Sequence, residues 1–242
     1  MNRWLKLTLD ILMGAVIPIA VLNYLSGPLG EVPAYLVSAL IPVAWVFIDL
    51  LFITKRFNVI TSYIGLTAIV RGLLAFWFVD GFWFAVKDSV GFVVGLVVFG
   101  GSILLRRPLA GEFVAQALNP DTPQRSAQLA SYFKEPRVRR ALVQGTLLML
   151  VVNVVLGIIN FWLNLQIVVA PFGTEAFNQQ VAQVNAITRL ALGIPDFLVT
   201  GFAMYRIFSA LYQGLPTEEG KSPWESEFWD LMRLRDEQAG AV

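Results

Sequence analysis

The chain has 242 residues, of which 57% are apolar and only 14% are charged, and its mean hydropathy is +0.66. Soluble domains carry about 25% charged residues, so this composition indicates a membrane protein, and a net charge of +1 points to no nucleic acid or other strongly charged partner. The chain contains no cysteine and no histidine, which excludes disulfides, thiolate nucleophiles, imidazole ligation of metal or haem, and histidine-based acid–base catalysis.

The apolar residues occur in six blocks of about twenty residues, the length of helix that crosses roughly 30 Å of hydrocarbon. The first predicted helix covers about 5–26. It contains Asp10 and has no small-x-small cleavage site, which favours a retained helix over a signal peptide. Pro18 lies in mid-span and removes a backbone donor, so we expect a kink there. The other five helices are predicted at about 32–54, 58–79, 84–105, 141–169 and 184–212.

Two amphipathic stretches lie outside these spans. The polar connection 106–140 predicts a short helix on the membrane surface and a second helix at about 123–134. In the tail, 213–242, Ser222-Pro223-Trp224-Glu225 has the pattern of a helix start. We expect the tail helix to lie at the interface, anchored by Trp224 and Trp229, or to dock onto a partner. The predicted apolar stripes are Leu109, Phe113, Val114 and Leu118 in the connection, and Trp224, Phe228, Leu231 and Leu234 in the tail.

The loops differ sharply in their content of Lys and Arg. There are two in the N-terminal segment, two at 55–57, seven in the connection and three in the tail, whereas the loops at 27–31, 80–83 and 170–183 have none. Cytoplasmic loops carry the excess of basic residues. The sequence therefore predicts an all-α membrane protein, with a six-helix transmembrane domain over 1–212, a cytoplasmic tail over 213–242, and both termini in the cytoplasm.

Eight ionisable residues fall inside the predicted spans, where each is costly unless it is paired or useful. Arg71 and Asp196 are expected near the midplane, where a lone arginine costs at least about 2.5–3.5 kcal/mol. A carboxylate at the same depth can bind it bidentately, so Asp196 is the first candidate partner and Asp88 is the second. The others are Lys87, Asp88 and Arg189, about one turn from the outer face, and Asp10, Asp49 and Arg206, about one turn from the cytoplasmic face. Lys87 and Asp88 are expected to reach the outer interface.

Polar residues also follow helical spacing. Asn153, Asn160 and Asn164 share one face of the fifth helix. These amides either hold helices together or line a polar cleft among helices two to six. In the same way, the charged set either fixes helix register or forms a substrate or proton site. On the second helix, one face carries Ser38, Pro42, Trp45 and Asp49.

Several short motifs in the first half resemble a known family. They are Gly30-Glu31-Val32-Pro33-Ala34 before the second span, Pro42 within it, basic residues at 55–56, and Lys87-Asp88-Ser89 opening a glycine-rich span that ends Arg107-Pro108-Leu109. Over about residues 10–112 the chain resembles bacterial inner-membrane proteins related to intracellular septation protein A. The resemblance implies a polytopic membrane protein that acts with the machinery of envelope growth and division, and it implies no catalytic residues.

The chain lacks a phosphate-binding glycine loop with lysine, a serine nucleophile elbow and an acidic metal cluster. We therefore expect a non-enzymatic protein without a cofactor, acting in or beside a larger cell-envelope complex as a scaffold or accessory subunit, with membrane lipids and other membrane proteins as partners. One alternative is a transporter or lipid-handling protein whose anion-attracting site contains Arg71, Lys87, Asp88, Arg189 and Asp196. Another is an accessory subunit that holds pigments or lipids against a cofactor-bearing partner. A water-accessible cavity at Arg71 would favour transport, and a fully paired Arg71 would favour the scaffold.

Overall fold

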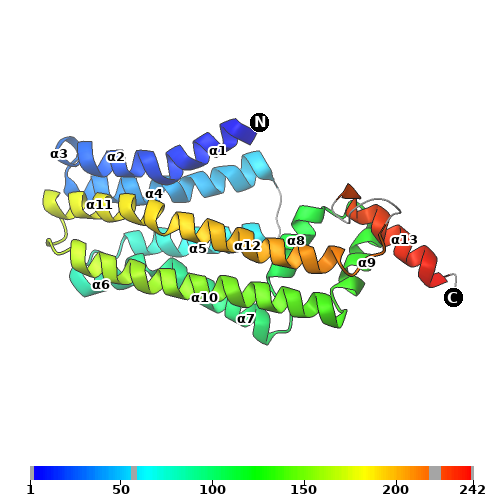
Figure 1. The fold of residues 1–242 in the computed structure, drawn as a ribbon. Helices are drawn as coiled ribbons and strands as arrows, with labels where there is room; N and C mark the ends of the chain where they lie inside the picture. The colour runs from blue at the N-terminus through cyan, green and yellow to red at the C-terminus, as the bar shows by residue number, and fades with distance from the viewer. Residues whose placement is uncertain (1–2, 56–58, 218–224, 241–242) are drawn as a thin grey trace. The chain divides into compact units, whose positions relative to one another are not determined.

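The structure is a computed structural model that describes residues 3–55, 59–217 and 225–240 (Figure 1). It is 84% helical, and the described residues contain no strand, so the all-α prediction is confirmed. Three helical segments are long and apolar enough to cross a membrane, and a bent pair of helices makes a fourth if it counts as one span. The three are Glu31–Ile53, Pro136–Ile167 and Glu175–Tyr212, and the bent pair is Gly81–Asp88 with Val90–Leu104.

A π-helical turn at Leu12–Val16 interrupts the first predicted helix, and another at Asp49–Thr54 ends the second. Pro18 lies two residues after the first of these turns, and its missing N–H removes a regular helical bond. The structure thus shows a widened turn beside the position where the sequence predicted a kink. The Ser38 hydroxyl donates to the Pro18 carbonyl oxygen at 2.9 Å and joins the two helices at this point. The elements are α1 (Arg3–Ile11), η1 (Leu12–Val16), α2 (Ile17–Tyr24), α3 (Ser26–Leu29), α4 (Glu31–Ile48) and η2 (Asp49–Thr54).

The third and fourth predicted spans differ from the sequence expectation. α5 (Val59–Ala75) ends four residues before the predicted position 79. The predicted continuous helix 84–105 is wrong, because α6 (Gly81–Asp88) and α7 (Val90–Leu104) meet at a 40° bend. Gly81 begins α6 with φ of +52°, a conformation that suits glycine.

The later helices begin earlier than predicted. α10 starts at Pro136 and not at 141, and the last predicted span starts at Glu175 and not at 184. Thr174 caps that start, because its hydroxyl accepts the Phe177 N–H at 3.2 Å. The elements are α8 (Ala110–Leu118), α9 (Pro123–Tyr132), α10 (Pro136–Ile167), α11 (Glu175–Ala191), α12 (Gly193–Tyr212) and α13 (Phe228–Gly240).

The chain divides into two compact units, the first formed by 1–97 and 152–197, and the second by 98–151 and 198–242. In the first unit, α4 packs against α2 and α5, and α11 packs against α2. Its core is largely aromatic at one end, where the Phe177 ring lies edge-on to Phe84, with ring centroids 5.1 Å apart, and tilted against Tyr35.

The core of the second unit buries the stripes that were expected to lie on the membrane. Val114 of α8 and Leu231 of α13 are fully buried in one cluster with Tyr132. Burial raises the pKa of Tyr132 to about 12, so its hydroxyl stays protonated and donates to the Leu211 carbonyl oxygen at 2.6 Å. The prediction of membrane-surface packing was wrong for these faces, because the two short helices cover each other's apolar residues.

The Trp229 side chain contacts residues of α8 and α9 in this unit. Its indole N–H donates to the Leu118 carbonyl oxygen at 3.0 Å, and the Arg125 guanidinium carbon lies 5.1 Å from its ring centroid. The indole N–H was expected to find its hydrogen-bond partner at the membrane interface, and α8 supplies that partner instead. Trp224, together with Ser222 and Pro223 of the predicted helix start, lies outside the described residues.

Candidate functional site

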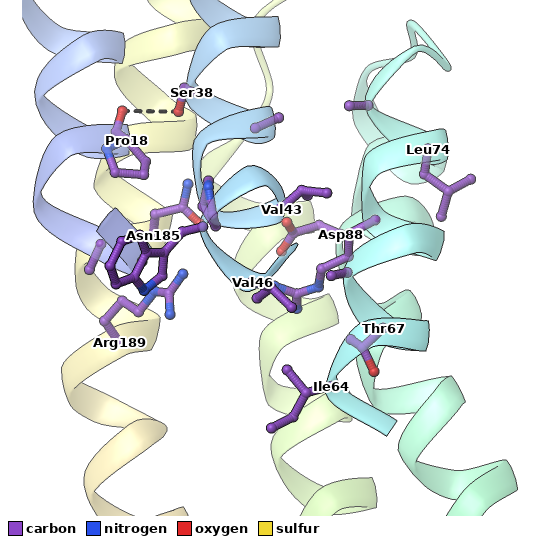
Figure 2. Close-up of a pocket in the computed structure, with 18 of the residues that line it drawn as sticks. Pro18, Ser38, Val43, Val46, Ile64, Thr67, Leu74, Asp88, Asn185 and Arg189 are labelled. Atoms are coloured by element: carbon purple, nitrogen blue, oxygen red, sulfur yellow. Dashed lines mark hydrogen bonds between the residues drawn. The ribbon is translucent and has the colours of Figure 1, made fainter. Parts of the chain in front are cut away.

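A cavity of about 540 Å³ lies in the first unit, and its lining comes from α1, η1, α2, α4, η2, α5, α6 and α11 (Figure 2). Small-molecule sites occupy about 300–1,000 Å³. The lining extends from Lys6 to Leu22, which is roughly 24 Å along the helices at 1.5 Å per residue. The cavity is therefore elongated, and its lining contains charged groups as well as many apolar residues, such as Val43 and Ala68.

The second-helix face that was singled out from spacing does line this cavity. Ser38, Pro42, Trp45 and Asp49 are all lining residues. Figure 2 shows Ser38 beside the Pro18 carbonyl at one side of the space. Helical periodicity alone was sufficient to identify these residues, because all four lie on one helix.

Lys6 organises the charges at one end. Its ammonium nitrogen lies 3.1 Å from Asp10 Oδ2 and 3.2 Å from Asp49 Oδ1, and the Trp45 indole N–H donates to Asp10 Oδ1 at 2.8 Å. Two carboxylates thus share one ammonium group. Asp10 and Asp49 were predicted to be close to one face of the membrane, but their partner Lys6 had been counted as a loop residue. The sequence signal for this ion pair is the spacing of four residues between Lys6 and Asp10, because residues four apart are neighbours on a helix.

Lys87 turns into the protein. Its side chain is buried, with the residue 6% exposed, and its ammonium donates to the Trp77 carbonyl oxygen at 2.7 Å and lies 4.8 Å from the Tyr35 ring centroid. Lys87 thus finds its partners inside the protein, close to the turn that follows α5. A carbonyl and an aromatic face supply the partners that water would supply at an interface.

The α10 amides hold Asp88 and the bend between α6 and α7. Asp88 Oδ2 accepts from Asn160 at 3.1 Å and from Asn164 at 2.8 Å. Asn160 also donates to the Ser89 hydroxyl at 3.1 Å, and Asn153 donates to the Phe92 carbonyl oxygen at 2.8 Å. All three amides therefore bind the interrupted segment, and none of them is among the residues that line the cavity. This outcome matches the helix-holding alternative for the amide face.

Small residues permit this close approach. A Cβ added at Gly95 would lie 2.4 Å from Asn153 Oδ1, and one added at Gly157 would lie 2.7 Å from the Phe92 Cβ. Real Cβ atoms do not approach so closely. The bend at Ser89 therefore depends on glycines on both helices as well as on the amide donors of α10.

Arg71 and Arg189 both line the cavity, and neither has a carboxylate partner. Among the described residues, no hydrogen bond joins either guanidinium to another group, and no carboxylate oxygen lies within 4.0 Å. The predicted pairs of Arg71 with Asp196 and with Asp88 are therefore not formed. Asp88 is held by the α10 amides, and Asp196 is exposed at the start of α12.

The Arg71 guanidinium instead packs against a glycine. A Cβ added at Gly91 would lie 2.9 Å from its Nη2 atom and 3.0 Å from Nε. Arg71 and Asp88 both lie within electrostatic range of Arg189, and Arg71 and Asp196 lie within range of the Tyr63 hydroxyl. Figure 2 shows Arg189 and Asn185 of α11 and Asp88 around the same space.

The arrangement suits an anion beside Arg71 and Arg189. These two guanidinium groups line the cavity together with Lys87 and Asp88, and Asp88 is already held by the α10 amides. Among the described residues, no group of three or more acidic side chains is placed to hold a metal ion. Arg206, also predicted as an intramembrane charge, belongs to the second unit, where its guanidinium carbon lies 6.0 Å from the Phe202 ring centroid.

No protein-family model, no curated protein and no solved structure matches this chain. The resemblance to septation-related membrane proteins therefore stays a prediction.

Proposed function

We propose that this protein is a transporter or lipid-handling protein of a bacterial inner membrane, and that it binds an amphiphile with an anionic head group in the cavity of the first unit. The observation that carries the proposal is the state of Arg71 and Arg189, two guanidinium groups that line one cavity without a carboxylate partner. An unpaired arginine at membrane depth costs at least about 2.5–3.5 kcal/mol. Bidentate binding of a phosphate or carboxylate to these groups would offset that cost.

The shape of the cavity supports an amphiphile over a small inorganic ion. Away from the charged groups its walls are mostly apolar, and the lining extends over roughly 24 Å of helix. A head group at Arg71 and Arg189 leaves part of this apolar wall for a hydrocarbon chain, and each buried CH₂ contributes about 0.8 kcal/mol.

We further propose six membrane spans with both termini in the cytoplasm. Three helical segments and one bent pair meet the length criterion. The two shorter apolar helices, Thr8–Tyr24 and Thr61–Ala75, are roughly 25 Å and 22 Å long at 1.5 Å per residue. Helices of that length cross when the bilayer thins locally or flanking residues reach outward. The distribution of Lys and Arg among the loops supports the orientation.

The binding proposal is tested on the full chain purified in dodecyl maltoside, with dodecyl phosphate as the probe, because both molecules carry the same hydrocarbon chain. Native mass spectrometry measures the bound probe. Removing one of two charge-assisted contacts costs about 1.5–3 kcal/mol, so Arg71→Gln and Arg189→Gln should each weaken binding at least about tenfold. Dodecyltrimethylammonium, a cation with the same chain, should not bind at this site. Equal affinity of the variants and the original chain for dodecyl phosphate would contradict the proposal.

A subtler variant keeps every charge. Gly91→Ala places a Cβ 2.9 Å from Arg71 Nη2, so the guanidinium must move and binding should weaken without loss of fold. Gly101→Ala on the same helix is the matched control, because a Cβ there meets nothing within 4 Å. If the two alanine variants bind the probe equally, the guanidinium does not contact the head group.

The scaffold and pigment-subunit predictions are tested by the same preparation. Envelope proteins that co-purify from native membranes, together with no preference for dodecyl phosphate, would favour the scaffold. Visible absorbance of the purified chain would favour the pigment-holding subunit.

A further inference from the structure

The second unit contains a groove of about 740 Å³ between α10 and α12. Lining positions recur at +4, +7, +8 and +11 from Arg137 on α10, and at the same spacings from Phe202 on α12, where the last position, Gln213, lies one residue past the helix end. This spacing keeps the positions on one face of each helix. The groove is therefore formed by two matching helical faces.

The groove is basic. Arg137, Arg140 and Arg206 line it, and none of its lining residues is acidic. Gln213 holds Arg137 in place, because its backbone carbonyl oxygen accepts from Nη1 at 3.3 Å and its side-chain oxygen accepts from Nη2. Among the described residues, no carboxylate oxygen lies within 4.0 Å of Arg140 or Arg206. The nearby Glu135 is paired with Arg235.

The groove changes from polar to apolar along its length. A Cβ at Gly145 would lie 2.4 Å from Ile207 Cδ1, so the two helices approach closely beneath the groove. Beyond the arginines the walls are Leu148, Phe202 and Ala203. Leu148 lies eleven residues after Arg137, roughly 16 Å along α10. Both helices belong to segments that are apolar enough to cross a membrane, so the apolar walls lead from the arginines toward the predicted hydrocarbon region.

We propose that this groove binds the phosphate head group of an anionic phospholipid, with an acyl chain lying along Phe202 and Leu148. The guanidinium fork matches the oxygens of a phosphate. Basic pockets between membrane-spanning helices on the cytoplasmic side suit lipid head groups, and the loop charges predict that side for the start of α10. The site lies in the second unit, is separate from the cavity of the first, and does not depend on the function proposed for that cavity.

The test uses the full chain in dodecyl maltoside, titrated with phosphatidylglycerol and, separately, with the zwitterionic phosphatidylcholine, and read by native mass spectrometry. The original chain should bind phosphatidylglycerol at least about tenfold more tightly, and Arg140→Gln/Arg206→Gln should lose this preference, since each lost charge-assisted contact is worth about a factor of ten. Arg107→Gln/Arg233→Gln is the matched control, because it removes the same charge from two exposed arginines outside the groove. The control should keep the preference.

Two further measurements keep the outcome decisive. Arg140→Lys/Arg206→Lys retains the charge and should bind phosphatidylglycerol more tightly than the glutamine variant, which separates loss of binding from loss of fold. sn-Glycerol 3-phosphate has a similar phosphate without acyl chains. If it displaces phosphatidylglycerol at equal concentration, the occupant is a soluble phosphate ester and the lipid proposal is overturned. A glutamine variant that keeps the full preference for phosphatidylglycerol also overturns it.

Discussion

The contact between Asn164 and Asp88 gives the sharpest quantitative prediction. Asn164 is 1% exposed, and its amide nitrogen donates to Asp88 Oδ2 at 2.8 Å and to the Asn160 carbonyl oxygen at 2.9 Å. Its side-chain oxygen accepts no hydrogen bond from the described residues. We consider Asn164→Leu, which removes the donor and the unsatisfied oxygen together while keeping a similar volume.

The single variant is a poor measure of the contact. A buried polar atom without a partner costs about 1–3 kcal/mol, so removing the Asn164 oxygen offsets part of the loss of the donor. The coupling energy between Asp88→Leu and Asn164→Leu isolates the pair. Hydrogen bonds between membrane helices average about 0.6 kcal/mol, with a maximum near about 1.7, and an ionised acceptor roughly doubles the strength. We therefore expect a coupling of about 1–2 kcal/mol.

The assay is reversible unfolding of the four chains of this cycle in mixed micelles, by titration with sodium dodecyl sulfate and circular dichroism. Asn153 supplies the control cycle, because it lies on the same face of α10 but donates to the Phe92 carbonyl oxygen. The cycle of Asp88→Leu with Asn153→Leu should be additive within about 0.5 kcal/mol. If the Asn164 cycle is additive, or if both cycles show the same coupling energy, the assignment of Asn164 as a partner of Asp88 is refuted.

Two further predictions concern the second unit and the topology. Leu231→Ala should lower the free energy of unfolding by about 2–5 kcal/mol, because Leu231 is fully buried between α13 and the rest of its unit; thermal unfolding measures this, and the exposed Leu190→Ala should change it by less than about 0.5 kcal/mol. Because the chain has no cysteine, a single Phe82→Cys should react with a membrane-impermeant maleimide on intact cells, and Thr217→Cys only after permeabilisation. The opposite pattern would contradict cytoplasmic termini.

Local pattern was enough to predict the helices and their polar faces. Blocks of apolar residues predicted an all-α membrane protein, and the +4 and +3 spacings identified the amide face of α10 and the Ser38–Asp49 face that lines the cavity. These features repeat within a single helix, so periodicity along the chain reports them directly.

The sequence by itself determined which residues are costly in a membrane, and the tertiary structure decided what each of them contacts. Spacing placed Arg71, Asp88 and Asp196 in the same interior. Only the packing of the helices determined that Asp88 accepts hydrogen bonds from two amides of α10 and that Arg71 lies beside Gly91. Likewise, the stripe containing Leu231 was visible in the sequence, and its burial against α8 and α9 was not. Partner choice between helices distant in sequence depends on their rotation and approach, and neither is encoded in the period of any one helix.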